Sequence, residues 1–184
     1  MPAGFIEPSI PTVASIPLSG HGWLHEIKHD GYRLVARLDG CTPRLFTRRG
    51  YDWSDRFPRI REALASLRAT SATIDGEAVV LCPKTGLSLF DDLHSGRRNH
   101  DVILYAFDLI ELNGDDLRHE PLEVRKATLT SLLTKARVGI RINEHIEAEA
   151  RQCSAMPASS DARASSPSSA ARPIARVEPR RGSR

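Results

Sequence analysis

The sequence predicts an α+β domain whose sheet is largely antiparallel. Short strand-like segments follow one another across tight turns, and an Asn-Gly pair at residues 113–114 is typical of a hairpin. Two segments carry apolar residues at the spacing of an amphipathic helix. Because strands joined by tight turns pair antiparallel, this mixture favours α+β architecture over regular βαβ winding.

The beginning of the chain predicts an extended segment and then three strands. Residues 1–22 form an extended lead-in, because four prolines exclude a helix: Pro2, Pro8, Pro11 and Pro17. Two strands, at residues 23–28 and 32–38, flank a turn at residues 29–31. A third strand at residues 44–47 follows Asp39-Gly40.

A helix and a strand are predicted next. Ser54 is suited to cap a helix that continues to Leu67, because four apolar side chains share one face: Phe57, Ile60, Leu64 and Leu67. A strand-like segment then covers residues 72–81, and Asp75-Gly76-Glu77 interrupts it.

The next part of the chain predicts a hairpin, a second helix and a final strand. The strongly apolar segment 103–112 leads into Asn113-Gly114, which returns the chain through Leu117. Pro121 suits the first turn of a helix with four leucines: Leu122, Leu129, Leu132 and Leu133. The last strand is predicted at residues 140–146.

The net charge of +3 averages two regions of opposite sign. Residues 151–184 contain seven arginines against Asp161 and Glu178, a balance of +5, which leaves −2 for residues 1–150. Ser, Ala, Pro and Arg dominate this tail, and it has too little apolar surface to offset the entropy of ordering. We therefore expect a lead-in at 1–22, a folded part at 23–147 and a disordered basic tail at 148–184.

The sequence indicates neither a membrane nor an oxidising compartment. No stretch reaches the about 20 apolar residues that cross a bilayer, and the N-terminus lacks the pattern of a secretory signal. The three cysteines, Cys41, Cys82 and Cys153, are too far apart for a zinc pair or a disulfide framework. We expect a cytoplasmic protein that binds no membrane.

The segment Glu26-Ile27-Lys28-His29-Asp30-Gly31-Tyr32-Arg33 concentrates charged residues in a strand-turn-strand pattern. Its lysine stands out, because only four of the 26 basic residues are lysines. In a strand, Glu26 and Lys28 project to one face and Ile27 to the other, as at a polar cleft backed by a core. Taken alone, the segment is more simply interpreted as a solvated hairpin edge with a Glu–Lys ion pair.

Four motifs in order resemble those of the ATP-dependent DNA ligases, a branch of the covalent nucleotidyltransferases. They are Lys28-x-Asp30-Gly31-x-Arg33 (motif I), Phe46-Thr47-Arg48-Arg49-Gly50 (motif Ia), Asp75-Gly76-Glu77 (motif III) and Tyr105-Ala106-Phe107-Asp108 (motif IIIa). The likeness covers residues 5–147 and is clearest to the ligase domains of bacterial end-joining ligases. It implies an ATP-grasp-like nucleotidyltransferase fold, with antiparallel sheets around a nucleotide cleft and the second sheet incomplete in this chain.

The resemblance implies a reaction at Lys28. Its amine attacks the α-phosphate of ATP, expels pyrophosphate and carries AMP to a DNA 5′-phosphate, from which a neighbouring 3′-OH displaces it. The amine must first lose its proton, which Arg33, Arg48 and bound Mg²⁺ or Mn²⁺ favour and which Glu26 and Glu77 oppose. The implied partners are nicked or broken double-stranded DNA and end-joining proteins, in the cytoplasm at the nucleoid.

The same resemblance places six residues at the nucleotide: Glu26, Ile27, Arg33, Arg48, Glu77 and Phe107. Glu26 accepts a hydrogen bond from the adenine amino group, and Phe107 stacks on adenine. Arg33 contacts the ribose or the 5′-phosphate, and Arg48 a phosphate or the nick. Glu77 binds the ribose hydroxyl or the metal.

Each of these residues also has an interpretation without a ligand. The arginines then lie in solvent, Asp75-Gly76-Glu77 is a turn, and Phe107 is a core aromatic. Asp108 faces the side opposite to Phe107 and needs a partner or exposure to water.

Later motifs of the family are not found in this sequence. The family continues with motif IV (Glu-Gly-Ile/Val-Val-x-Lys), motif V with two lysines, and an OB domain, but no Glu-Gly pair follows Ala150 and Lys135 is the last lysine. We interpret the chain as a truncated ligase domain with impaired or lost activity, whose tail results from a frameshift. The alternative is a non-catalytic fragment or a DNA-binding module, in which the tail arginines bind phosphates.

Overall fold

The computed structural model describes residues 6–8 and 24–146, which fall into two compact units. The larger unit contains residues 6–8 and 29–143, and the smaller contains residues 24–28 and 144–146. Apart from residues 6–8, the predicted lead-in lies outside the described residues, as does the whole basic tail. The proposed division into lead-in, folded part and tail therefore stays a prediction.

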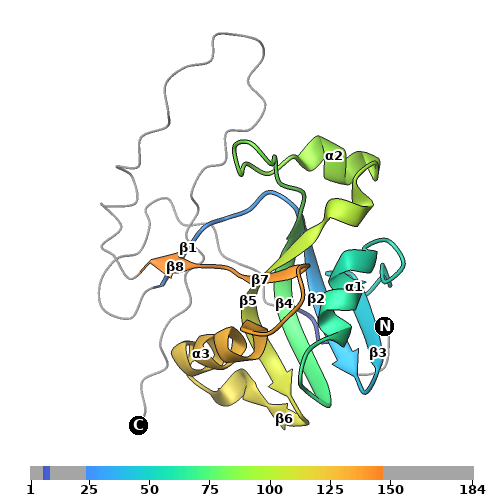
Figure 1. Cartoon of the computed structure of the whole chain (residues 1–184). Coiled ribbons are helices and arrows are strands. Elements are labelled where there is room, and N and C mark those ends of the chain that lie inside the picture. Colours follow the sequence, from blue (N-terminus) through green and yellow to red (C-terminus); the bar gives the residue numbers. More distant parts are fainter. Residues whose placement is uncertain (1–5, 9–23, 147–184) are drawn as a thin grey trace. The chain divides into compact units, whose positions relative to one another are not determined.

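A mainly antiparallel sheet of six strands forms the larger unit and confirms the predicted α+β class (Figure 1). Its strands lie in the order β3-β2-β4-β5-β6, and β7 pairs with β5 in parallel. The strand bounds are β2 Tyr32–Asp39, β3 Thr42–Thr47, β4 Ser71–Val79, β5 Ile103–Leu112, β6 Asp115–Asp116 and β7 Ile140–Ile142. Tight turns join β2 to β3 and β5 to β6, which fixes these pairs as antiparallel.

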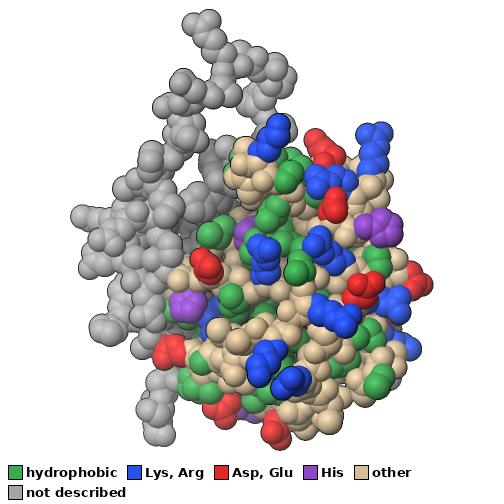
Figure 2. Space-filling model, in the orientation of Figure 1, with side chains coloured by type: hydrophobic (Ala, Val, Ile, Leu, Met, Phe, Trp, Pro, Cys, Tyr) green, Lys and Arg blue, Asp and Glu red, His purple; other side chains and the backbone are tan. Residues whose placement is uncertain are grey.

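Helices α1 (Pro58–Ala65) and α3 (Leu122–Leu133) cover one face of this sheet (Figure 1). Alternate strand residues, such as Leu34, Ile74 and Leu104, pack beneath them into one hydrophobic core. The outer surface on this side carries interspersed acidic and basic side chains (Figure 2). Within the described residues, every helix is too short or too polar to cross a membrane.

The structure confirms the predicted apolar face of α1 but neither its predicted start nor its predicted end, since the helix ends at Ala65 and not at Leu67. Phe57, Ile60, Leu64 and Leu67 are all buried, as the spacing indicated. The helix begins at Pro58 rather than after Ser54, because the residue before a proline is disfavoured in the helical conformation and proline itself suits the first helical position. The Ser54 hydroxyl instead accepts a hydrogen bond at 3.0 Å from the backbone N–H of Leu45 in β3.

The Asn-Gly hairpin is confirmed, whereas three short elements were not predicted. Asn113 and Gly114 both adopt positive φ, at 53° and 93°, and connect β5 to β6. The unpredicted elements are α2 and two 3₁₀ turns: Phe90–Ser95, Asn99–Asp101 and Leu117–His119. They are too short for an apolar period to develop in the sequence.

The predicted interruption at Asp75-Gly76-Glu77 is wrong, because β4 passes through these residues as a strand. Gly76 faces the core, where β5 approaches closely. A Cβ at this position would lie 2.7 Å from the carbonyl oxygen of Tyr105 and 2.9 Å from the Leu104 side chain. Glycine is therefore required here by the spacing of two strands and not by a turn.

Gly76→Ala is expected to lower the free energy of unfolding by about 1–3 kcal/mol, because the methyl group must be forced against the backbone of β5. The better strand propensity of alanine opposes this loss by at most about 1 kcal/mol. Urea unfolding followed by circular dichroism measures the difference. Equal or higher stability of the variant would contradict the close approach of the two strands.

The smaller unit contains the two-stranded sheet of β1 (His25–Glu26) and β8 (His145–Ile146). The predicted pairing of residues 23–28 with residues 32–38 is wrong, since β1 pairs antiparallel with β8. The predicted last strand at 140–146 is broken at Asn143-Glu144, so that its halves belong to different sheets. Within the described residues, this second sheet has two strands. The expectation that it is incomplete stays a prediction.

Candidate active site

The face of the large sheet opposite to the helices carries a row of polar and aromatic side chains. The strand register places Arg33 of β2 opposite Glu77 of β4, Glu77 opposite Tyr105 of β5, and Tyr105 opposite Arg141 of β7. Side chains directly opposite one another project from the same face of a sheet. The row therefore brings a cation, a carboxylate, an aromatic ring and a second cation side by side.

Arg33 forms an ion pair with Asp75 on this face. Its Nε and Nη2 atoms donate to the two carboxylate oxygens of Asp75 at 3.0 Å and 2.7 Å, a bidentate ion pair. The Asp75 side chain is only 2% exposed, and that of Arg33 15%. The carboxylate of Asp75 is therefore buried, while Arg33 retains limited exposure, and loss of either partner from such a pair is costly.

Phe107 adjoins the same ion pair. The guanidinium carbon of Arg33 lies 5.5 Å from the centre of the Phe107 ring, a cation–π contact. Phe107 is buried, as its interpretation as a core aromatic predicts, but it is not part of the hydrophobic cluster beneath α1 and α3. Asp108 has the partner that its burial requires, since Arg125 of α3 donates to it at 2.7 Å.

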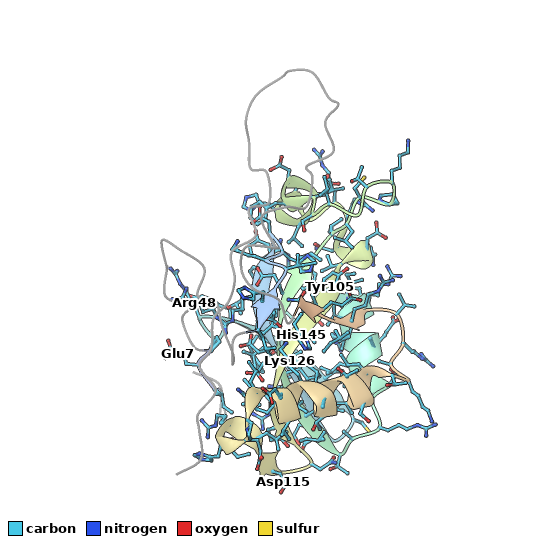
Figure 3. The ribbon with its side chains drawn as sticks, turned by 90° about the vertical axis from the view of Figure 1, so that its left-hand side faces the viewer. Glu7, Arg48, Tyr105, Asp115, Lys126 and His145 are labelled. Atoms are coloured by element: carbon cyan, nitrogen blue, oxygen red, sulfur yellow. The ribbon has the colours of Figure 1, made fainter. Side chains whose placement is uncertain are left out.

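Arg33 and Arg48 line one cavity of about 710 Å³ at the end of β2 and β3. Arg49 lines it as well, together with Glu7, Gly31, Tyr32, Thr47, Tyr51 and Trp53. Figure 3 shows Arg48 and Glu7 near one another on the same side of the sheet. Guanidinium groups are suited to phosphate oxygens, so the cavity has the chemistry of an anion site.

The predicted residues of the larger unit are thus only partly assembled around this cavity. Glu77 and Phe107 are not among the lining residues; each is connected to the cavity through Arg33, by register or by ring contact. Sequence reasoning did not assign a role to Arg49 or Asp75, although both stand inside the quoted motifs. The Arg48-Arg49 pair in the sequence could have indicated a second arginine at the phosphate. The ion pair of Asp75 with Arg33 has no sequence signal, because the two residues are 42 positions apart.

His29 is a further residue of this region that sequence reasoning gave no role. Its ring stacks on Tyr105 with 3.9 Å between ring centres, and its Nε2 atom hydrogen bonds to the Asn143 Oδ1 atom at 3.1 Å. Burial lowers the pKa of His29 below its usual range, and the hydrogen bond to Asn143 opposes that shift. His29 thus secures the start of the Asp30-Gly31 turn to β5 and the end of β7.

Three predicted residues belong to the smaller unit. Glu26 lies in β1, where it pairs with His145 of β8. Ile27 and Lys28 follow β1, and both side chains are exposed in this unit. The exposure of Ile27, at 55%, does not agree with the expectation that it backs a polar cleft with core, because the strand ends before it.

The residues present fit a magnesium ion that is shared with a bound nucleotide. Within the described residues, no group of three or more His, Cys, Asp or Glu side chains is arranged to hold a metal alone. Mg²⁺ in nucleotide enzymes is bound by one or two carboxylates plus substrate phosphates and water. Glu77, half-buried in the row described above, is a carboxylate of this kind.

Comparison with known proteins agrees with this geometry. A family model described as an ATP dependent DNA ligase domain matches residues 11–155. The multifunctional non-homologous end joining protein LigD of Pseudomonas aeruginosa is 38% identical over 132 residues, which are 70% of this chain and 16% of that protein. The corresponding protein of Mycobacterium bovis is 35% identical over 121 residues, 66% of this chain and 16% of that protein. The chain thus spans a small part of these relatives.

Two solved structures share the fold. The ligase domain of Mycobacterium tuberculosis LigD has a TM-score of 0.62 and 30% identity, over 73% of this chain and 44% of that one. A mycobacterial DNA ligase D complexed with ATP and MES has a TM-score of 0.64 and 30% identity, over 77% and 48%. The predicted nucleotidyltransferase fold is therefore confirmed. Motifs, sheet and matches agree that the chain belongs to the family of ATP-dependent DNA ligase domains, with similarity to the adenylation domain of the end-joining type.

Proposed function

We propose that this domain catalyses the first step of DNA ligation, the transfer of AMP from ATP to Lys28. In that step the lysine nitrogen forms a bond to the α-phosphorus, the bond from this phosphorus to the bridging oxygen breaks, and pyrophosphate leaves. The amine proton passes to solvent. The observation that carries the proposal is the Arg33, Asp75 and Phe107 cluster, since three of the four ordered motifs meet in it.

The proposed nucleotide contacts follow the chemistry of each side chain. Phe107 offers an aromatic ring for the adenine base, and Glu26 an acceptor for its amino group. Arg33 and Arg48 bind phosphate oxygens from the cavity that they share, to which Arg49 adds a third cation. Ile27 contacts the nucleotide beside Lys28.

Lys28 is covalently connected to a residue of this region. It is bonded to His29, so that the two Cα atoms are about 3.8 Å apart. His29 stacks on Tyr105, the cross-strand neighbour of Glu77. This connection supports Lys28 as the nucleophile and not one of the lysines at positions 84, 126 and 135.

Glu77 is the proposed carboxylate for the ribose hydroxyl or for Mg²⁺, with Mn²⁺ as a substitute. When bound, the metal neutralises charge on the reacting phosphates. The chain's own contribution is to hold the carboxylate of Glu77 next to Arg33 in the register of β2 and β4.

The later steps are proposed from the relatives. Proteins named for non-homologous end joining match most of this chain, which supports nicked or broken double-stranded DNA as the acceptor of AMP in DNA repair and recombination. End-joining proteins are the proposed partners, in the bacterial cytoplasm at the nucleoid. Because motif IV and motif V are not found in the sequence, we propose that adenylation by this chain is impaired.

Incubation of the purified chain with ATP labelled at the α-phosphate, in the presence of Mg²⁺, tests the proposal. A covalent, acid-labile AMP adduct is expected, and its formation should require Mg²⁺ and be reversed by added pyrophosphate. Chelation of the metal provides the matched control. Absence of the adduct under all these conditions would contradict the proposed activity.

The alternative function is a non-catalytic DNA-binding module that acts through the basic tail. The balance of +5 over residues 151–184 favours it, because arginines that neutralise phosphates release counterions and bind DNA without sequence preference. A chain that forms no adduct, yet binds DNA with an affinity that falls steeply with salt, would support this alternative.

A further inference from the structure

Helix α3 carries two consecutive cations, Arg125 and Lys126, that are directed to the centre of β5. Lys126 is only 4% exposed, and its ammonium group donates to the carbonyl oxygen of Phe107 at 3.0 Å. Arg125 donates to the Asp108 carboxylate at 2.7 Å, and these two side chains are 12% and 8% exposed. Figure 3 shows Lys126 between α3 and the sheet. Two neighbouring residues of the helix therefore hold two neighbouring residues of the strand.

The strand is irregular where these contacts are made. The register between β4 and β5 pairs Gly76 with Ala106 but Asp75 with Asp108, so Phe107 is the extra residue of a β-bulge. Bulges bend a strand and redirect the side chain of the extra residue. The direction of the Phe107 ring is thus not fixed by the ladder of β4 alone.

The outer edge of β5 leaves room for these contacts. There, β7 pairs with Leu104 to Ala106, and β6 pairs with Glu111 and Leu112. Between these two partners, the segment 107–110 pairs with β4 on the other edge, but no strand of the described part of the chain pairs with it on this edge. Lys126 reaches this gap and donates to a backbone carbonyl oxygen, as the N–H group of a strand would, whereas Arg125 bonds to the Asp108 side chain.

Burial of the Lys126 ammonium group lowers the stability of the fold. Transfer of an ammonium group from water to the interior is unfavourable, and a hydrogen bond to a neutral acceptor compensates the lost hydration only in part. An apolar side chain of similar length would fill the same space beneath α3 without that cost. The retained charge therefore points to a requirement for the position of the Phe107 backbone.

We propose that Lys126 and Arg125 are positioning residues that hold the bulge at Phe107 so that its ring presents a fixed face to the adenine base. This inference rests on the proposed function, since it deepens the role of Phe107 in ATP binding. Neither cation contacts the nucleotide; both act through β5. Nucleotide affinity then depends on a helix that lies on the opposite face of the sheet.

Binding of α,β-methylene-ATP, which cannot lose pyrophosphate, tests the proposal in the full chain by calorimetry. Lys126→Met is expected to weaken this nucleotide about three- to tenfold, the range of one lost aromatic contact, and to leave the affinity for inorganic tripolyphosphate unchanged. Phe107→Ala should weaken the nucleotide by about tenfold or more. Adding Lys126→Met to Phe107→Ala should cause no further loss, because the two changes remove one interaction.

Two controls separate positioning from folding. Lys135→Met removes an exposed lysine just after α3 and should leave both affinities as in the wild type. Lys126→Met itself should unfold at nearly the wild-type urea concentration, since a buried charge is exchanged for an apolar group. Equal losses of nucleotide and tripolyphosphate affinity, additive losses in the double variant, or no loss at all would each overturn the positioning role.

A measurement on the free protein keeps this inference distinct from the proposed function. The Arg33 guanidinium lies over the Phe107 ring, so the NMR shift of its Nε–H group reports the ring position. Lys126→Met should move this signal, and Lys135→Met should not. If the wild type binds no nucleotide, the proposed function fails. The Arg33 signal still tests the control of Phe107 by α3: a shift in Lys126→Met supports this control, and an unchanged signal overturns it.

Discussion

Lys28→Ala is expected to abolish the covalent AMP adduct, the largest effect of any single substitution in this chain. The proposed adduct is a phosphoramidate whose nitrogen is that of the Lys28 amine. Of the three other lysines, Lys126 is buried and donates to the Phe107 carbonyl oxygen, while Lys84 and Lys135 are exposed outside the quoted motifs. The amine of Lys126 is thus engaged in the interior, and none of the three lysines lines the cavity of Arg33 and Arg48. Intact-protein mass spectrometry after incubation with ATP and Mg²⁺ measures the adduct.

Lys28→Arg tests whether Lys28 is the nucleophile, because this change keeps the positive charge but removes the amine. A guanidinium group stays protonated in proteins, so the variant should bind ATP yet remain unlabelled. Lys135→Ala is the matched control and should be labelled as efficiently as the wild type. Labelled Lys28→Arg protein, or loss of labelling in Lys135→Ala, would place the nucleophile elsewhere.

Local patterns in the sequence were sufficient for much of the fold. The apolar face of α1 and the positive φ angles of Asn113 and Gly114 follow from residue spacing and turn chemistry, and both are confirmed. The pairing of β1 with β8 could not be predicted in this way, because it joins residues separated by more than a hundred positions. The start of α1 was predicted wrongly because Ser54 suits a cap, while its hydroxyl bonds instead to β3.

In the candidate site, too, features that depend on nearby residues could be predicted, and features that depend on distant residues could not. Its residue types were predictable from the motifs, and the register of β2 and β4 brings Arg33 and Glu77 together. The bulge at Phe107 was not predictable, since it depends on how β5 fits β4 over its whole length. The prediction of a turn at Gly76 is wrong because the sequence Asp-Gly-Glu contains no information on the strand that packs against it.

Asp75→Asn is expected to lower the free energy of unfolding by about 3–5 kcal/mol, because it removes the carboxylate charge from a buried, bidentate ion pair with Arg33. The intact ion pair stabilises the fold by much less than this, because the free energy of removing both charges from water offsets most of their mutual attraction. Arg33→Met combined with Asp75→Leu should therefore recover most of the lost stability. Urea unfolding of the single and double variants, followed by circular dichroism, provides the comparison.

The same pair of variants separates stability from nucleotide binding. In the double variant the fold is restored, but the cavity loses Arg33 and the Phe107 ring loses the guanidinium that lies over it. We expect this variant to unfold cooperatively and still to form no AMP adduct, because it lacks the guanidinium that both lines the cavity and contacts the ring. If the double variant were labelled like the wild type, Arg33 would be a structural partner of Asp75 with no part in nucleotide binding. If Asp75→Asn cost less than about 1 kcal/mol, water would have access to the pair, in contradiction to its burial.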